Sequence, residues 1–239
     1  MKIDIVIPFY RKYHDIPRTA WGLRQNLANI NRVIIVNDEL WTSDTKSIAC
    51  TICYGLPLIL LDHPHEGFGA HKCANQGLYM VETEYWSLLD ADIVLTPGTI
   101  QRELEYAAPN KIVYPHVHDI PQSTSTEELH SPKILRKYGY GGTHPDSKPW
   151  LRYRDCHTLE HTESSLALNG RSNFPGYGFI DYDYGCRWAL EYGIENIILG
   201  VGDAYDPGEC KPEERKSWSQ VNLDMFNVTL KRFKDEFGF

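Results

Sequence analysis

Short apolar runs alternate along the first part of the chain with longer segments in which apolar residues recur at the spacing of a helix. The apolar runs are rich in β-branched residues and are bounded by turn residues, which is typical of buried strands. We expect these strands at residues 2–8, 33–36, 57–61 and 85–89. The segments between them predict helices over residues 14–30, 44–54 and 70–82, the second of them capped by Ser43 and Asp44. This alternation predicts a doubly wound α/β fold whose mostly parallel sheet is flanked by helices.

In the second part of the chain, this alternation of strands and helices continues only in places. A helix from residue 97 to 107 and a strand over 111–116 continue it, but residues 118–156 are rich in Pro, Gly, Ser, Thr, His and Tyr and show little periodicity. A segment this long without regular structure is usually functional or disordered, and its aromatic residues argue against disorder. We therefore expect an irregular insertion or mobile flap. The remaining pattern predicts a short strand at 166–168, a helix over 181–192 ended by Gly193, a strand at 196–199 and a C-terminal helix over 217–237.

Composition narrows the functional classes. The chain of 239 residues is 42% hydrophobic and 23% charged, which is ordinary for a soluble globular protein. Its net charge of −8, with no run of more than two basic residues, disfavours a broad nucleic-acid surface, although a local groove of Arg152, Arg154 and Arg171 would allow binding. No window approaches the roughly 20 apolar residues that span a bilayer. The N-terminus lacks a basic-then-apolar signal, so we expect a cytoplasmic protein.

The six cysteines are scattered, and only Cys50 and Cys53 lie close together. They fall inside a predicted helix, and no second pair stands at the spacing of a zinc site. We interpret them as reduced cysteines of the core, with a zinc or redox role as the alternative.

Two carboxylates, Asp90 and Asp92, directly follow the predicted strand 85–89. Open α/β sheets bind ligands at the carboxyl ends of their strands. Mg2+ and Mn2+ are usually held by one or two carboxylates together with phosphate oxygens of a substrate. The spacing therefore predicts a divalent cation shared with a phosphorylated substrate, with a turn of solvated aspartates as the alternative.

Four segments, taken in order, resemble the family 2 glycosyltransferases and the wider nucleotide-sugar-dependent transferases of GT-A fold. They are Ile5–Tyr10, Val33–Asp38, Gly67–Asp92 and Phe174–Asp183, the last followed by Arg187. The resemblance covers residues 3–105 well and 173–195 less closely. It implies a single GT-A domain over residues 1–239, with a nucleotide-binding half at 1–105 and an acceptor-side half at 106–239 that holds the insertion and the C-terminal helix.

The resemblance assigns the nucleobase to residues that follow the first two strands. Pro8, Tyr10 and Asp38 would hold it, because a carboxylate can accept the N3–H of a pyrimidine and an aromatic ring can cover the base. Simple packing is the alternative for Tyr10. The segment Asn37–Leu40 departs from the usual Asp-Asp-Gly-Ser of the family after its second position, which leaves the shape of that loop open.

The resemblance assigns the diphosphate to the acidic stretch and to the helix after the third strand. Asp90 would contact the ribose or a metal-bound water, and Asp92 would bind the Mn2+ or Mg2+ that bridges the diphosphate and neutralises the leaving nucleotide. Lys72 and Asn75 would touch the nucleotide. A solvated helix face is the alternative for Lys72.

On the acceptor side, Asp181 matches the general base of inverting family members. It would take a proton from the acceptor hydroxyl, and Asp183 would be a secondary acceptor contact. Charge complementarity at a helix N-terminus is the alternative for both. Some relatives have a histidine metal ligand downstream; here the last histidine is His161, so Asp203 or Asp206 would have to substitute, or water and phosphate would complete the shell.

Our hypothesis is a metal-dependent, inverting glycosyltransferase that moves a sugar from a nucleoside diphosphate sugar, with UDP expected, to a hydroxyl acceptor. The acceptor is a glycan, a lipid or another molecule, a modified DNA base included; the oligomeric state stays open. The alternatives are a nucleotidyltransferase, for which Phe9–Lys12 lacks the usual glycine-rich loop, and a non-catalytic module that binds sugar nucleotides or glycans. His157-Thr-Leu-Glu160-His161 also has the form of a zinc-peptidase helix, with its histidines at i and i+4. The segment is short and no third ligand stands out, so we do not expect a peptidase; the histidines would line the acceptor pocket or lie on the surface.

Overall fold

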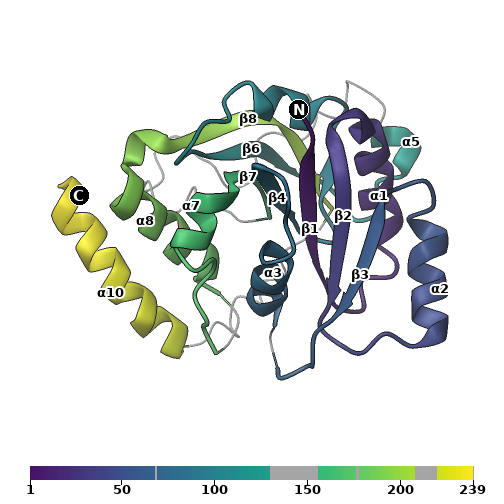
Figure 1. The fold of residues 1–239 in the computed structure, drawn as a ribbon, viewed down its shortest axis with the longest axis horizontal. Coiled ribbons are helices and arrows are strands. Elements are labelled where there is room, and N and C mark those ends of the chain that lie inside the picture. Colours follow the sequence, from purple (N-terminus) through teal and green to yellow (C-terminus); the bar gives the residue numbers. More distant parts are fainter. Residues whose placement is uncertain (68, 130–155, 176–177, 208–219, 239) are drawn as a thin grey trace.

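The computed structural model describes residues 1–67, 69–129, 156–175, 178–207 and 220–238. They form a mixed α/β fold in which helices flank one eight-stranded sheet of order β3-β2-β1-β4-β7-β6-β8-β5 (Figure 1). The strands are β1 (Ile3–Phe9), β2 (Ile30–Asn37), β3 (Leu58–Asp62), β4 (Tyr85–Leu89), β5 (Val94–Leu95), β6 (Ile112–Asp119), β7 (His157–His161) and β8 (Ile197–Asp206). The helices are α1 (Ile16–Gln25), α2 (Ser43–Ile52), α3 (Ala70–Leu78), α4 (Thr99–Leu104), α5 (Thr126–Leu129), α7 (Thr162–Ala167), α8 (Ile180–Tyr192) and α10 (Gln220–Phe237), with 3-10 turns η1 (Leu27–Asn29) and η3 (Ile194–Asn196).

The predicted parallel half is confirmed, because β1 pairs in parallel with β2 and β4, and β2 pairs in parallel with β3. Successive residues of β1 enter different cores. Ile5 and Ile7 pack in the cluster that α1 and α2 cover, whereas Val6 packs against α3. A strand covered on both faces needs apolar residues at every position, which explains the continuous apolar runs.

The second half of the sheet is mixed. Strand β7 runs antiparallel to both β4 and β6, and β5 runs antiparallel to β8, whereas β6 and β8 are parallel. Helices α8 and α10 enclose a second core around Trp188, Phe226 and Phe233. The sheet is therefore continuous from the first half into the second.

Two sequence-based predictions for this half are wrong. Residues 166–168 do not form a strand but belong to the end of α7 and the residue after it, and residues 157–161 form β7. All five residues of β7 are buried although four of them are polar or charged. Hydrogen bonds satisfy these residues, such as that of His157 with Glu103 and that of Glu160 with Arg171, so the local apolar pattern did not identify them as a strand.

Element boundaries shift for identifiable reasons. Helix α2 is capped by Thr42, whose side chain accepts from the Thr45 N–H in a capping box, and not by Ser43 and Asp44. Strand β8 continues past the predicted residue 199, with Gly200 and Gly202 at φ of +76° and +77° where its register with β6 shifts.

The expected irregular region 118–156 begins in regular structure, since β6 extends to Asp119 and is followed by the short helix α5. Residues 130–155 of this region, which include Arg152 and Arg154, lie outside the described residues. None of the helices within the described ranges is both long and apolar enough to cross a membrane.

Candidate active site

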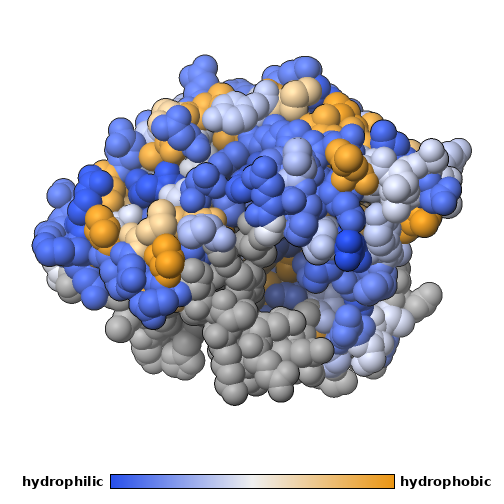
Figure 2. All heavy atoms as spheres, turned by 90° about the horizontal axis from the view of Figure 1, so that it is seen from below, coloured by the Kyte–Doolittle hydropathy of each residue, from blue (hydrophilic) through white to orange (hydrophobic). Residues whose placement is uncertain are grey.

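The carboxyl ends of the parallel strands gather polar residues at one edge of the sheet. Phe9 lies beside Asn37, and Asn37 lies beside Asp62, so the residues that follow these strands are neighbours. Strand β4, which is parallel to β1, brings Asp90 to the same edge. Figure 2 looks onto this edge and shows a hollow in the surface with hydrophilic residues around it. Ligands of open α/β sheets bind at this position.

Asp38 is a buried carboxylate at the tip of β2. Its N–H donates to the Phe9 carbonyl at 2.7 Å, and the residue is 4% exposed. Oδ2 lies 3.2 Å from Nδ1 of His65, whereas Oδ1 has no hydrogen-bond partner among the described residues. A Cβ at Gly69 would lie 2.5 Å from both carboxylate oxygens, so only glycine allows α3 to begin this close to Asp38. Buried acceptors are normally satisfied, so the lone pairs of Oδ1 fit an N–H donor from a ligand.

Tyr10 lies beside Asp38, at the end of β1. Its ring is parallel to the imidazole of His65, with an angle of 2° and a centroid distance of 4.7 Å. Pro8 is a buried residue of β1. The structure thus brings the three predicted nucleobase residues together and adds His65, which the sequence analysis did not single out.

Asp92 carries a positive partner. Nζ of Lys12 donates to Oδ2 of Asp92 at 2.7 Å, and the two side chains are 48% and 25% exposed. Burial lowers the pKa of the Lys12 ammonium, but Asp92 first and then Asp15 and Asp90 outweigh it and raise that pKa. The Asp90 N–H donates to the Cys156 carbonyl, which anchors the acidic turn to the residue directly before β7.

Asp90 and Asp92 are the candidate ligands of a divalent cation at this edge of the sheet. No group of three or more His, Cys, Asp or Glu residues within the described ranges could hold a metal ion. Asp90 and Asp92 alone are a donor set of two carboxylates, and Asp92 already attracts the ammonium of Lys12. Such a set fits a cation whose remaining ligands are water and substrate phosphates, and it does not fit a closed protein cage.

Within the described residues, neither Asp203 nor Asp206 joins Asp90 and Asp92 to make a group of three metal ligands. Oδ1 of Asp203 lies 2.9 Å from Nε2 of His118 on the neighbouring strand β6. This hydrogen bond lowers the pKa of Asp203, although burial opposes it. The carbonyl of Asp206 accepts the Ile120 N–H. If a cation binds Asp92, water and phosphate are its remaining ligands.

The two acidic residues at the start of α8 differ in their surroundings. Asp183 is 2% exposed and accepts from Ser172 Oγ, Arg187 Nε and Thr229 Oγ1. It therefore joins α8 to α10 and to the preceding loop. Asp181 is half-buried in the first turn of the helix. Its role as a general base, and an acceptor contact of Asp183, remain predictions.

The residues predicted on α3 already have partners in the protein. Nδ2 of Asn75 donates to the Arg171 carbonyl and its Oδ1 accepts the Arg171 N–H, both at 2.8 Å. Asn75 thus fixes the loop before α8. Nζ of Lys72 lies 3.3 Å from the exposed carboxylate of Glu66. Nucleotide contacts of Asn75 and Lys72 remain predictions.

A buried charged network lies between β7 and the loop before α8. Nη2 of Arg171 donates to Oε1 of Glu160 at 2.5 Å, and both side chains are at most 1% exposed. The guanidinium lies over the ring of Tyr184 at 4.2 Å and over Trp86 at 5.2 Å. Burial, with the charge of Glu160, raises the pKa of Tyr184. Arg171 is therefore part of the core and not of a surface groove for nucleic acid.

The zinc-peptidase reading of residues 157–161 is wrong, because the segment is a strand. Nε2 of His157 lies 3.0 Å from both carboxylate oxygens of Glu103, on α4. Its Nδ1 lies 3.1 Å from the Leu88 carbonyl, just before the acidic turn. Glu160 points instead to Arg171, and His161 lies 2.8 Å from Ser164 Oγ. In a strand, His157 and His161 share one face but lie about 13 Å apart, four residues at roughly 3.3 Å each, and Glu160 is on the opposite face.

Cys50 and Cys53 are both free thiols, and only Cys53 is buried in the core that the sequence predicted for both. Burial raises the pKa of the Cys53 thiol to about 11, which keeps it protonated and unreactive at neutral pH.

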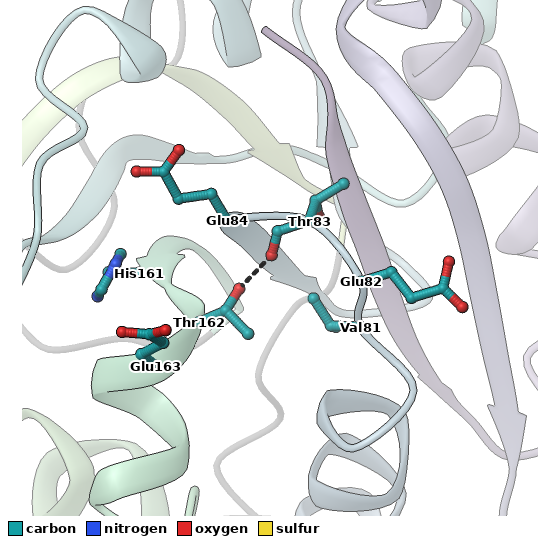
Figure 3. Close-up of a pocket in the computed structure, with 7 residues that line it drawn as sticks. All are labelled: Val81, Glu82, Thr83, Glu84, His161, Thr162 and Glu163. Atoms are coloured by element: carbon teal, nitrogen blue, oxygen red, sulfur yellow. Dashed lines mark hydrogen bonds between the residues drawn. The ribbon is translucent and has the colours of Figure 1, made fainter.

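A cavity of about 450 Å³ lies at the opposite edge of the sheet, at the amino end of β4 (Figure 3). Its lining is Val81, Glu82, Thr83, Glu84, His161, Thr162 and Glu163. The Thr162 hydroxyl donates to the Thr83 carbonyl, which closes one side of it. Because the cavity lies at the far end of β4 from Asp90, it does not belong to the candidate site.

The chain is similar to known proteins both in sequence and in fold. The sequence profile of glycosyl transferase family 2 matches residues 4–159. No curated protein sequence matches the chain. The fold is similar to that of the mannosyltransferase PcManGT from Pyrobaculum calidifontis in complex with GDP-Man and Mn2+, with a TM-score of 0.62 and 13% identity over 90% of this chain and 59% of that one.

Two further solved structures are similar. S. aureus TarS 1-349 in complex with UDP-GlcNAc has a TM-score of 0.71 and 12% identity, over 96% of this chain and 66% of that one. Glucosyl-3-phosphoglycerate synthase from Mycobacterium tuberculosis, in complex with Mn2+, UDP and glucosyl-3-phosphoglycerate, has a TM-score of 0.62 and 13% identity, over 97% and 79%. The chain spans 59% and 66% of the length of the first two structures, and at these identities the likeness is one of fold.

Proposed function

The chain belongs to glycosyl transferase family 2, and from that premise we propose that it transfers a sugar from a nucleoside diphosphate sugar to a hydroxyl group of an acceptor. The observation that carries the proposal is the meeting of Tyr10, Asp38 and the Asp90-Ala-Asp92 turn at one edge of the sheet. Structures of similar fold hold GDP-Man with Mn2+, UDP-GlcNAc, or UDP with Mn2+.

The donor base is recognised by Asp38 and Tyr10 in this proposal. Oδ1 of Asp38 is buried and accepts only, so it selects a base with a ring N–H next to it. Uracil and thymine have this group at N3, and guanine has it at N1. Among these we propose UDP, because two of the similar structures hold UDP or UDP-GlcNAc, with Tyr10 as the ring on which the base stacks.

The diphosphate lies over the acidic turn. Asp92, assisted by Asp90, would hold Mn2+ or Mg2+, and the ion when bound would neutralise the charge that develops on the leaving nucleotide. Lys12 adds a positive charge 2.7 Å from Asp92 and is close enough to attract a phosphate oxygen as well. Binding here is thus a balance between two carboxylates, one ammonium and the charge of the donor.

Transfer proceeds with inversion in this proposal. The acceptor oxygen attacks the anomeric carbon on the face opposite the nucleotide, and the bond from that carbon to the diphosphate oxygen breaks. The hydroxyl proton passes to the carboxylate of Asp181. Asp183, fixed by Ser172, Arg187 and Thr229, holds the start of α8 in place. The acceptor itself is a hydroxyl compound whose class the described residues do not select.

Release of UDP from UDP-glucose and UDP-GlcNAc in the presence of Mn2+, with GDP-mannose for comparison, tests the proposal. We expect the wild-type protein to release nucleotide and Asp92→Ala to lower the rate by about 100-fold or more, the loss expected when a group that stabilises the leaving charge is removed. Asp235→Ala, an exposed aspartate on α10 paired with Lys231, is the matched control and should keep the wild-type rate. Equal rates in wild type and Asp92→Ala would contradict the assignment. Tight UDP binding without any release would favour a non-catalytic module.

A further inference from the structure

His65 makes two contacts at the candidate nucleobase site. Its imidazole lies parallel to the Tyr10 ring at a centroid distance of 4.7 Å and an angle of 2°. Its Nδ1 lies 3.2 Å from Oδ2 of Asp38. The side chain is 41% exposed, and it belongs to the loop between β3 and α3.

The first of these contacts is the one that the proposed function assigns to the base of the donor, and the second engages the same carboxylate. A pyrimidine would stack its flat ring on Tyr10 and point a ring N–H at Oδ1 of Asp38, whereas the imidazole of His65 stacks on Tyr10 and contacts Oδ2. A centroid distance of 4.7 Å is that of rings in direct contact, so no third ring fits between Tyr10 and His65. The carboxylate side chain of Asp38 is 6% exposed with His65 beside it. A base that stacks on this face of Tyr10 therefore has to displace the imidazole of His65.

Charged and titratable groups lie on two sides of the Tyr10–His65 pair. Glu39 faces His65 from the loop after β2, and it pairs with Arg11 at 2.7 Å. Arg11 lies over the Tyr10 ring at 5.0 Å from its centroid. His71 and Cys73 of α3 face Asp38, Lys72 lies beside them, and His63 precedes His65 on the same loop. The Tyr10–His65 pair is thus framed by an ion pair on one side and by α3 on the other.

We propose that His65 and the nucleobase of the donor compete for one position, so that His65 is an internal competitor that lowers the affinity of the protein for its nucleotide. This inference rests on the proposed function. For the base to stack on this face of Tyr10, the imidazole of His65 leaves that ring. The donor affinity then equals the intrinsic affinity multiplied by the fraction of molecules in which His65 has left.

Calorimetric titration of wild-type protein and His65→Ala with UDP, at fixed Mn2+ and pH, tests the proposal. We expect His65→Ala to bind UDP about 5- to 20-fold more tightly, because the ring contact with Tyr10 and the Nδ1 contact with Asp38 no longer oppose the base. Stopped-flow measurements should place the gain in the association rate, since removal of the competitor raises the fraction of open molecules. Inorganic pyrophosphate, which has no base, should bind equally to both proteins.

His63→Ala is the matched control, because His63 lies on the same loop but its Nδ1 is 2.9 Å from Gln76 Oε1 and not at Asp38. It should bind UDP as the wild type does. If the wild type binds UDP and His65→Ala binds it equally or more weakly, the inference is overturned but the proposed function is not. Such a result would mean that His65 does not block Asp38, or that it supports the bound base. An equal gain for pyrophosphate would overturn it too. Failure of both proteins to bind UDP would overturn the proposed function together with this inference.

Discussion

Asp181 and Asp183 stand two positions apart at the start of α8, but Asp183 is buried whereas Asp181 is half-buried. Asp183 accepts from three side chains that belong to three different segments of the chain. Three hydrogen bonds hold this carboxylate in one position, and hydrogen bonds to charged groups contribute more than neutral ones. We therefore expect Asp183 to act through the position of α8, and Asp181 to act on the substrate.

Asn substitutions at these two positions should give opposite results. Asp181→Asn keeps the shape of the helix start but cannot accept a proton, so we expect transfer to fall by about 100-fold or more with little change in the melting temperature or in UDP affinity. Asp183→Asn leaves Arg187 without its counter-charge, and we expect it to lower the free energy of unfolding by about 2–4 kcal/mol. Transfer assays and urea unfolding of both variants check this. A stable, fully active Asp181→Asn would contradict the role of Asp181.

The sequence does not separate these residues. Both fall in the first turn of a predicted helix, where acidic residues are favoured in any case. The partners that bury Asp183 are far away along the chain: Ser172 is 11 residues before it, and Thr229 is 46 residues after it. The same reasoning applies to Asn75, whose partner Arg171 is 96 residues away.

Strand β7 is an element that the hydrophobic pattern of the sequence does not predict. Its polar residues satisfy the rule that a buried charge is paired, but each partner lies on another element: Glu103 on α4 for His157, and Arg171 in the loop before α8 for Glu160. The apolar strands β1, β2 and β4 were predictable because burial on both faces leaves a continuous local signal. A strand that is stabilised by charge pairs leaves no such local signal in the sequence.

Removal of Arg171 should therefore destabilise the protein strongly. Arg171→Met leaves Glu160 buried without its counter-charge, and we expect a loss of about 3–5 kcal/mol in the free energy of unfolding. Lys231→Met removes an exposed pair with Asp235 on α10 and should change stability little, because surface ion pairs contribute almost nothing. Guanidinium unfolding of the two variants gives the comparison. Similar losses in both would show that the buried network is not what holds β7 to α8.

At the scale of the whole molecule, one sheet carries the donor residues at the carboxyl ends of its strands and continues into a mixed half that places α8. The position of Asp38, Asp90 and Asp92 at one edge follows from topology, so the sequence could predict it. The contacts of His65 with Tyr10 and of Lys12 with Asp92 depend on side chains in connections between elements, and no periodicity encodes these. The zinc-peptidase motif failed for the same reason, since its meaning depended on a helix that the fold does not form there.

The central claim is that the acidic turn after β4 and the tip of β2 together bind a nucleoside diphosphate with a divalent cation. The most direct measurement is calorimetric titration of UDP into wild type and Asp92→Asn, each with and without Mn2+. The account predicts that Mn2+ raises the affinity of the wild type by at least about tenfold, roughly 1.4 kcal/mol, and that Asp92→Asn loses this gain. UDP binding that is indifferent to Mn2+ in the wild type, or that keeps its full gain in Asp92→Asn, would contradict it.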